Sequence, residues 1–252
     1  MKNEVVNDPE RFMSYEYDDY GKPIQESERF RYLLDLINNK IKKDGITILD
    51  IGGASGVFLD TLMRASNYKI SAYNLDFDGY YKDKQVSNEI KFLNLSILDS
   101  KMKEEQFDIV TFRHVLHHLV GNNVKETKDN QRKALSEIFR ILKEGGTLIF
   151  EEQVNNIELF SRIVYHLSKL ANKWGIKSKT IQIGDVIVLF LTQGELRRLI
   201  ESNDKDRKSN IEIKEMKYVS RNLELKWKIT LLMCSGGSVF GVVRKVQRRH
   251  NL

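Results

Sequence analysis

Short β-branched segments alternate with amphipathic segments along the first 150 residues, and this rhythm constrains the fold more than any other feature. The predicted strands span 46–51, 70–75, 90–95, 107–112 and 147–150. Apolar residues at intervals of three and four predict helices over 25–43, 57–66 and 131–143. Strands that alternate with helices pair in parallel, because right-handed crossovers return the chain to the same end of the sheet. We therefore predict an α/β fold with a doubly wound, mostly parallel sheet.

The rhythm changes after residue 152. A long amphipathic helix is predicted over 157–174, and Thr192 followed by Glu195 is a capping box that begins a helix over 192–201. A polar loop is expected over 121–130 and a charged loop over 202–210. Two strands are expected over 211–219 and 238–245, and the segment 223–234 between them is ambiguous between helix and strand. The glycine pair Gly145-Gly146 is expected to end the helix before the fifth strand.

No linker or internal repeat divides the chain, so a single domain is expected. Its parts would be an N-terminal arm, a ligand-binding core, helices forming a lid, and the final strands, over 1–24, 25–152, 153–210 and 211–252. The arm is polar and contains four aromatic residues, Phe12, Tyr15, Tyr17 and Tyr20. It is either a docked tail or a flap whose rings cover a ligand.

Composition excludes several classes of protein. The chain has 252 residues and one cysteine, Cys234, so it forms no internal disulfide and no cysteine-based metal cluster. The N-terminus has no apolar signal core, and the most apolar stretch, 230–243, is shorter than the ~20 residues of a spanning helix. We expect a soluble, cytoplasmic protein without a membrane span. The net charge of +6 permits an anionic partner without requiring one.

A glycine-rich turn, Asp50-Ile51-Gly52-Gly53-Ala54-Ser55-Gly56, directly follows the first predicted strand. Small residues let the backbone approach a ligand at the carboxyl end of a strand, where the next helix offers unpaired N–H groups. The nicotinamide fingerprint Gly-x-Gly-x-x-Gly is not met, because Ala54 and Val57 occupy its later glycine positions. No lysine is present for a Walker loop.

Asp76 stands at the end of the second strand, followed by Phe77. A carboxylate at this place can accept hydrogen bonds from both hydroxyls of a ribose, and a phenyl ring can lie against adenine.

These features together resemble the class I S-adenosylmethionine-dependent methyltransferases. The resemblance rests on the glycine turn, Asp76, Phe107-Asp108-Ile109-Val110, Val115-Leu116-His117-His118-Leu119, and the run from Glu137 to Ile149. It covers residues 46–152 firmly and the rest loosely. It implies a seven-stranded sheet whose last strand pair is antiparallel, S-adenosyl-L-methionine as cofactor and S-adenosyl-L-homocysteine as product.

The resemblance also implies cofactor contacts. Gly52, Gly53, Ala54 and Gly56 would pass under the methionine part, and Asp50 would hold the loop and help to bind the amino group. Asp76 would accept hydrogen bonds from the ribose hydroxyls. Adenine would contact Phe77, with Ser96 and Ile97 at its edge. The amino-acid end of the cofactor would lie near Phe112 and Arg113. Ala54 replaces a frequent glycine and is acceptable if its φ is negative. Ser96 replaces a frequent acid, so either Ser96 or Asp99 could meet the adenine amino group.

Three histidines follow the fourth strand, at positions 114, 117 and 118. They either pack and cap, or supply a general base, for which His118 is the first choice and His117 the second. No third ligand accompanies the pair His114 and His118, so no metal is expected.

The acceptor is predicted as an O, N or C nucleophile of a small, partly apolar metabolite. Thr111-Phe112-Arg113-His114 lacks the motif of amino-directed nucleic-acid methyltransferases, so a nucleic-acid partner is not expected. The helix over 157–174 either closes over a substrate or simply packs on the core. The basic stretches, Lys173, Lys177, Lys179 and 244–250, are either solvated or hold RNA. The alternatives are a methyltransferase acting on RNA or protein, and a non-catalytic cofactor-binding regulator.

Overall fold

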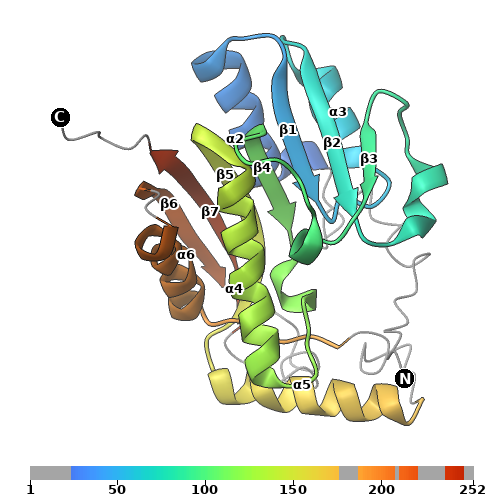
Figure 1. Ribbon diagram of the computed structural model, residues 1–252, viewed down its shortest axis with the longest axis vertical. Helices are drawn as coiled ribbons and strands as arrows, with labels where there is room; N and C mark the ends of the chain where they lie inside the picture. The colour runs from blue at the N-terminus through green and yellow to red at the C-terminus, as the bar shows by residue number, and fades with distance from the viewer. Residues whose placement is uncertain (1–23, 176–186, 208–209, 221–235, 247–252) are drawn as a thin grey trace.

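A seven-stranded sheet forms the centre of the molecule (Figure 1). The computed structural model describes residues 24–175, 187–207, 210–220 and 236–246. The strand order is β3-β2-β1-β4-β5-β7-β6, in which β1 to β5 run parallel and β7 is antiparallel to both of its neighbours. The strands are β1 (Ile46–Ile51), β2 (Ile70–Asp76), β3 (Lys91–Asn94), β4 (Phe107–Arg113), β5 (Leu142–Asn155), β6 (Asn210–Ser220) and β7 (Gly236–Val246). The predicted fold class is confirmed, including its antiparallel final pair.

Helices cover both faces of this sheet. Successive strand residues point to opposite faces, so Ile48 packs in the cluster with α2 (Glu28–Asp35) and α3 (Val57–Ala65), whereas Leu49 packs in the cluster with α4 (Val124–Ile141) and α6 (Gln193–Arg207). Short helical turns complete the chain: η1 (Ile24–Glu26), η2 (Leu36–Ile41), η3 (Gly79–Lys84), η4 (Ile97–Asp99) and η5 (Leu116–His118).

Three predicted boundaries are wrong. Helix α4 begins at Val124, inside the expected polar loop, because the Asn123 side chain caps it by accepting from the Glu126 N–H at 2.9 Å. Gly145 and Gly146 do not end that helix but lie within β5, which begins at Leu142. Helix α6 continues to Arg207, through most of the expected charged loop. Polar residues at exposed helical positions hide the period on which such predictions depend.

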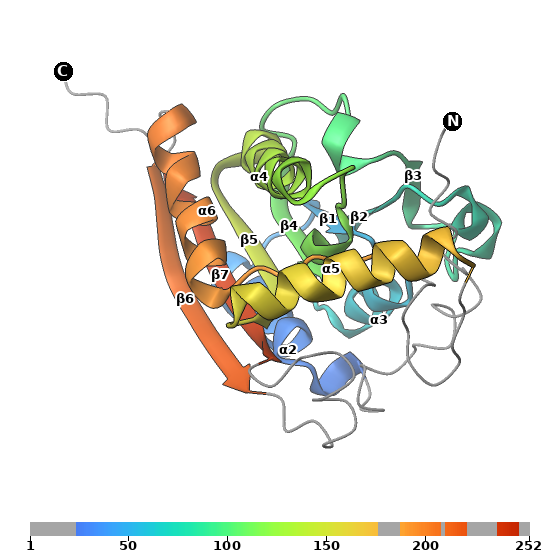
Figure 2. The ribbon, with the colours of Figure 1, turned by 90° about the horizontal axis from the view of Figure 1, so that it is seen from below.

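Helix α5 (Glu158–Lys173) crosses the end of the sheet toward which β1, β2 and β4 point (Figures 1 and 2). The Tyr165 hydroxyl donates to the Gly121 carbonyl at 2.9 Å. Lys128 of α4 pairs with Glu158 at 2.8 Å and with Glu195 of α6 at 2.6 Å. These polar contacts hold α5 across the carboxyl ends of the strands.

No helix among residues 24–175 and 187–207 is long and apolar enough to cross a membrane. The aromatic residues of the arm, the ambiguous segment, Cys234, Lys177, Lys179 and the last basic residues, Arg248, Arg249 and His250, lie outside the described residues. Lys245, in the same basic stretch, is buried in β7 and pairs with Glu105 at 3.3 Å.

Candidate functional site

The carboxyl ends of the parallel strands β1 to β5 meet on one edge of the sheet, and the predicted site residues lie at or just beyond the ends of β1, β2, β3 and β4. Strand β1 lies between β2 and β4, so successive crossovers leave it toward opposite sides. Such a switch point opens a crevice beyond the strand ends, where open α/β sheets bind ligands.

The glycine turn lies directly on the ends of β1 and β2. Gly52 and Gly56 have positive φ angles of 71° and 78°, a conformation that glycine adopts without steric cost. Gly53 has no room for a side chain, because a Cβ atom there would lie 2.8 Å from Asp50 Oδ2 and closer still to Asn74 Oδ1. The turn therefore presents bare backbone at the edge of the sheet.

Ala54 also has a positive φ, 47°, so the condition under which alanine was expected to fit is not met. Hydrogen bonds hold its two peptide groups in place. Its N–H donates to Asp76 Oδ2 at 3.2 Å, and its carbonyl accepts from the amides of Asn74 and Gln85, both at 2.8 Å. Asn74 and Gln85 thus stabilise a strained residue, a role that the sequence analysis did not assign.

Asp76 is 7% exposed and lies where β2 ends. Besides the Ala54 contact, its Oδ1 accepts from the Asp78 N–H at 3.0 Å. Burial raises its pKa to about 6, although both backbone hydrogen bonds lower it. Phe77 beside it is 63% exposed. The end of β2 therefore carries a buried acceptor next to an exposed ring, and their contacts with ribose and adenine stay a prediction.

Asp50 has a partner that the sequence analysis missed. Arg29 of α2 donates from Nη1 to Asp50 Oδ1 at 3.0 Å and lies over the Phe58 ring, 3.6 Å from its centroid. Arg29 is 5% exposed and Asp50 is 1% exposed, so this ion pair lies under the turn. The backbone N–H of Arg29 donates to Glu151 at 3.2 Å and ties α2 to β5. Asp50 therefore lies directly beneath the turn with Arg29 as its partner, and its role in holding the loop stays a prediction.

Two expected contacts point into the core. The Phe112 side chain is fully buried and stacks on Phe150 at 5.2 Å, so only its backbone faces the edge. Ile97 is buried, and the Ser96 hydroxyl oxygen accepts from the Leu98 N–H at 3.2 Å, which caps η4. Arg113 lies 3.5 Å from Glu151.

The histidine turn after β4 is held by Glu152, which the sequence analysis also missed. Glu152 accepts hydrogen bonds from the N–H groups of Val115 at 3.1 Å and Leu116 at 2.8 Å, and its Oε1 lies 2.5 Å from His117 Nδ1. Glu152 is 1% exposed, and its burial raises its pKa to about 7. Its position at the end of the fifth strand was the available sequence signal.

The three histidines differ in environment. His117 is 4% exposed and stacks on Phe190, with ring centroids 5.0 Å apart. His118 is half-buried, and its ring lies 4.1 Å from that of His117. Burial and the neighbouring His117 hold the pKa of His118 well below its usual value. His114 adopts a positive φ of 55°, and its N–H donates to the Glu151 carbonyl at 2.8 Å.

Together these groups define a site with three chemical capacities. Bare backbone and a helix N-terminus suit the polar end of a ligand, a buried carboxyl suits a diol, and a neutral imidazole suits proton removal. No cluster of three metal-ligating side chains occurs among the described residues.

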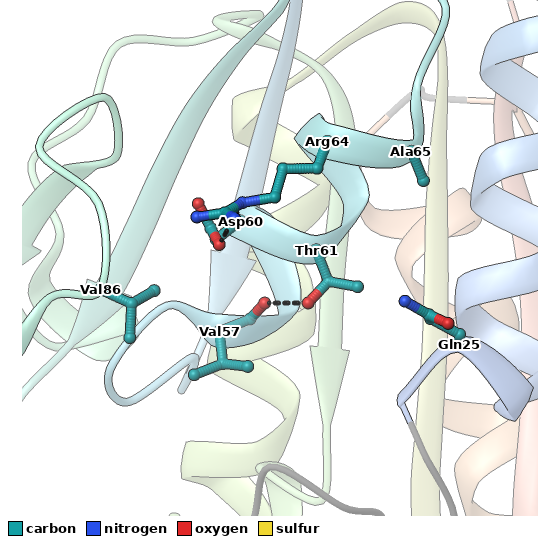
Figure 3. Close-up of a pocket in the computed structure, with 7 residues that line it drawn as sticks. All are labelled: Gln25, Val57, Asp60, Thr61, Arg64, Ala65 and Val86. Carbon is teal, nitrogen blue, oxygen red and sulfur yellow. Dashed lines mark hydrogen bonds and ion pairs between the residues drawn. The ribbon is translucent and has the colours of Figure 1, made fainter.

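A cavity of about 490 Å³ lies elsewhere, on the outer side of α3 (Figure 3). An ion pair between Asp60 and Arg64, at 2.9 Å, crosses it. It is lined by Gln25, Val57, Asp60, Thr61, Arg64, Ala65 and Val86. None of the predicted cofactor residues is among them, although Val57 directly follows Gly56 and the Val86 N–H donates to the Ser55 carbonyl of the turn at 3.0 Å.

Comparison with known proteins agrees with this geometry. A family described as "Methyltransferase domain" matches residues 25–203. A search of the curated proteins gave no match.

Three solved structures show the same fold. The N-methyltransferase NodS from Bradyrhizobium japonicum, in complex with S-adenosyl-L-homocysteine, is 16% identical, with 97% of this chain and 95% of that chain covered and a TM-score of 0.55. A methyltransferase from Methanosarcina mazei is 15% identical, with 81% and 94% covered and a TM-score of 0.58. The [4+2]-cyclase SpnF is 13% identical, with 87% and 81% covered and a TM-score of 0.57.

Proposed function

The chain belongs to the methyltransferase-domain family of S-adenosylmethionine-dependent enzymes, and from that premise we propose that it methylates a small, partly apolar metabolite. The observation that carries the proposal is the meeting, on one edge of the sheet, of the glycine turn, buried Asp76 and the half-buried His118. The apolar acceptor is suggested by α5, which crosses the same edge and has several apolar side chains.

The cofactor would lie across the turn. Asp76 would accept hydrogen bonds from the ribose hydroxyls, and Phe77 would lie against adenine, with the backbone of Ser96 and Ile97 at its far edge. The backbone of Gly52, Gly53, Ala54 and Gly56 would pass under the methionine part. Asp50, already paired with Arg29, supports this backbone from inside. The backbone of Phe112 and the residue Arg113 would border the amino-acid end.

The bound cofactor supplies an activated methyl group on a sulfonium, so the protein has to position the acceptor and, where needed, remove a proton. We assign His118 as the general base, because its lowered pKa keeps the imidazole neutral and able to accept a proton near pH 7. His117 positions it: the buried ring is held by Glu152 and packs against His118.

The test uses S-adenosylmethionine labelled in its methyl group, incubated with cell extract separated into metabolites, RNA and protein. We expect label in the metabolite fraction alone. Label only in RNA or protein would contradict the proposed acceptor class, and tight cofactor binding without transfer to any fraction would point to a regulator.

Variants connect this activity to the site. We expect His118→Ala to lower turnover about 10²–10⁴-fold with little change in S-adenosylhomocysteine affinity. Asp76→Ala should lose that affinity instead. His166→Ala, an exposed histidine of α5, is the matched control and should change neither. Full turnover of His118→Ala would remove this residue from the mechanism.

A further inference from the structure

Exposed apolar side chains gather on helix α5. Nine large apolar side chains of the described residues are exposed, and five of them lie within 157–174. Leu159, Leu167, Leu170 and Trp174 are 63%, 46%, 40% and 65% exposed, and together they form what we call the α5 stripe. Their spacing of three, four and eight residues places them along one side of the helix.

The buried side of α5 has the opposite character. It consists of Ser161, Val164, Tyr165, Ser168 and Ala171. Two serines and an alanine thus face the protein beside Val164 and Tyr165, while three leucines and a tryptophan face outward. Ordinary packing would place the larger apolar residues inside, so the stripe indicates a surface that contacts something apolar.

Cations border the stripe. Arg162, Lys169 and Lys173 follow one another at intervals of seven and four residues, on the side of the helix next to Leu159 and Leu170. The helix has one acid, Glu158, which is paired with Lys128 and Arg162, and Lys169 donates to the Asn122 carbonyl, so Lys173 is the cation of this line with no such contact within the described residues. The outer surface of α5 is therefore apolar along one line and basic along the next.

We propose that α5 docks on the surface of an anionic lipid bilayer. A helix that combines Leu and Trp on one line with Lys and Arg on the adjacent line lies in the interface plane, with its rings and leucines among the acyl chains and its cations at the headgroups. A second copy of this chain fits less well, because two α5 helices would bring their Lys169 and Lys173 side chains together. Charge complementarity thus favours anionic lipid.

Docking would orient the whole molecule. Helix α5 crosses the carboxyl ends of the strands (Figure 2), so a bilayer on its outer side would lie next to the candidate site. The acceptor would then be an amphiphile taken from the lipid phase, an inference that rests on the proposed methyl transfer. The docking itself does not depend on methyl transfer.

Vesicle sedimentation tests the proposal with the full chain. Vesicles of phosphatidylglycerol and phosphatidylcholine should bind the protein, and vesicles of phosphatidylcholine alone should bind it much less. The triple variant Leu159→Ser, Leu167→Ser, Trp174→Ser should lose binding at least tenfold. Lys173→Glu should lower it more than about fivefold, since each cation near such a surface contributes about that factor.

Val219→Ser on β6 is the control, because Val219 is also half exposed but lies on a strand and outside the α5 stripe. It should bind vesicles like the wild type. All variants should bind S-adenosylhomocysteine normally, which separates failure of docking from failure of the proposed function. No binding to anionic vesicles, equal binding by the triple variant, or self-association that the triple variant abolishes would overturn the proposal.

Discussion

Ala54 adopts a backbone conformation that suits glycine better than alanine. Its φ of 47° brings Cβ close to the following carbonyl, at a cost of roughly 1–2 kcal/mol. Ala54→Gly removes this strain but adds freedom to the unfolded chain, worth about 0.4–1 kcal/mol. We expect the variant to raise the free energy of unfolding by up to about 1 kcal/mol, measured by urea denaturation.

Ala65→Gly is the matched control for this substitution. Ala65 is exposed and ends α3 with ordinary helical geometry, so glycine there should leave stability unchanged or lower it by up to about 1 kcal/mol. A loss of stability in Ala54→Gly as large as that in Ala65→Gly would show that residue 54 is not strained.

Asp76 should make cofactor binding depend on pH. Its pKa of about 6 means that the carboxyl is protonated below pH 6 in the unliganded protein. Ribose hydroxyls donate to the ionised form, so affinity for S-adenosylhomocysteine should fall up to tenfold for each pH unit below about 6 and level off above it. Calorimetric titrations from pH 5 to pH 8 measure this.

Asp76→Asn keeps an acceptor but cannot ionise. It should bind more weakly at pH 8 and show a nearly constant affinity between pH 5 and pH 8. If the wild type is equally flat, the carboxyl is not the group that receives the ribose.

At this scale the sequence predicts residues whose chemistry follows from their place after a strand. Asp76 and the glycine turn belong to this class. Arg29, Asn74 and Glu152 were not predicted, because each acts through a partner distant in the chain: Asp50, the Ala54 carbonyl and the histidine turn. Only the packing of β1, β2, β4 and β5 brings these pairs together, so no local pattern reports them.

Among the elements, α5 depends most on polar contacts. Tyr165→Phe removes the hydroxyl that donates to Gly121 and leaves that carbonyl without this hydrogen bond, at a cost of about 1 kcal/mol. We expect amide hydrogen exchange in α5 to become about fivefold faster, while exchange in β1 and β4 changes little.

Tyr32→Phe serves as the control for this experiment. Tyr32 packs on Phe240, and its hydroxyl makes no hydrogen bond within the described residues. The control should leave exchange in α5 unchanged. Equal exchange in Tyr165→Phe and the wild type would show that the Tyr165 hydroxyl does not hold α5 to the turn.

Element prediction succeeded where a period or a cap is strong. Strand β1 matches its predicted bounds, and the capping box is formed, with Glu195 N–H donating to Thr192 at 3.1 Å. It failed at Val124, because the first turns of α4 are mostly polar, and at the Gly145 turn, because β5 already begins at Leu142 and carries on through it. In both places the signal is a side-chain cap or a pairing partner rather than a local pattern.

At the scale of the molecule, the alternation of strands and helices was enough to predict the parallel part of the sheet. The antiparallel final pair came from the family resemblance, and the position of β7 between β5 and β6 was not predicted, because alternation in the sequence does not specify which strand inserts where. Glu152 is buried only because the elements of the complete fold pack around it.

This burial should make the stability of the whole molecule depend on pH through Glu152. Its folded pKa of about 7 exceeds the ordinary 4.5, so between these values the folded protein holds a proton that the unfolded chain releases. Stability from this group is therefore largest below pH 4.5 and is lost as pH rises to 7, by roughly 3 kcal/mol in total. The contribution of this group is isolated by comparing the wild type with Glu152→Gln.

Urea denaturation at each pH measures the unfolding free energy of both proteins. The wild-type value minus the Glu152→Gln value should fall by roughly 2–3 kcal/mol between pH 4.5 and pH 7.5. Glu144→Gln, at an exposed carboxyl of β5, is the control variant and should change the unfolding free energy by no more than about 0.5 kcal/mol. A difference for Glu152 that instead grows with pH would mean that the carboxylate is stabilised in its ionised form by His117, and that the ion pair outweighs burial.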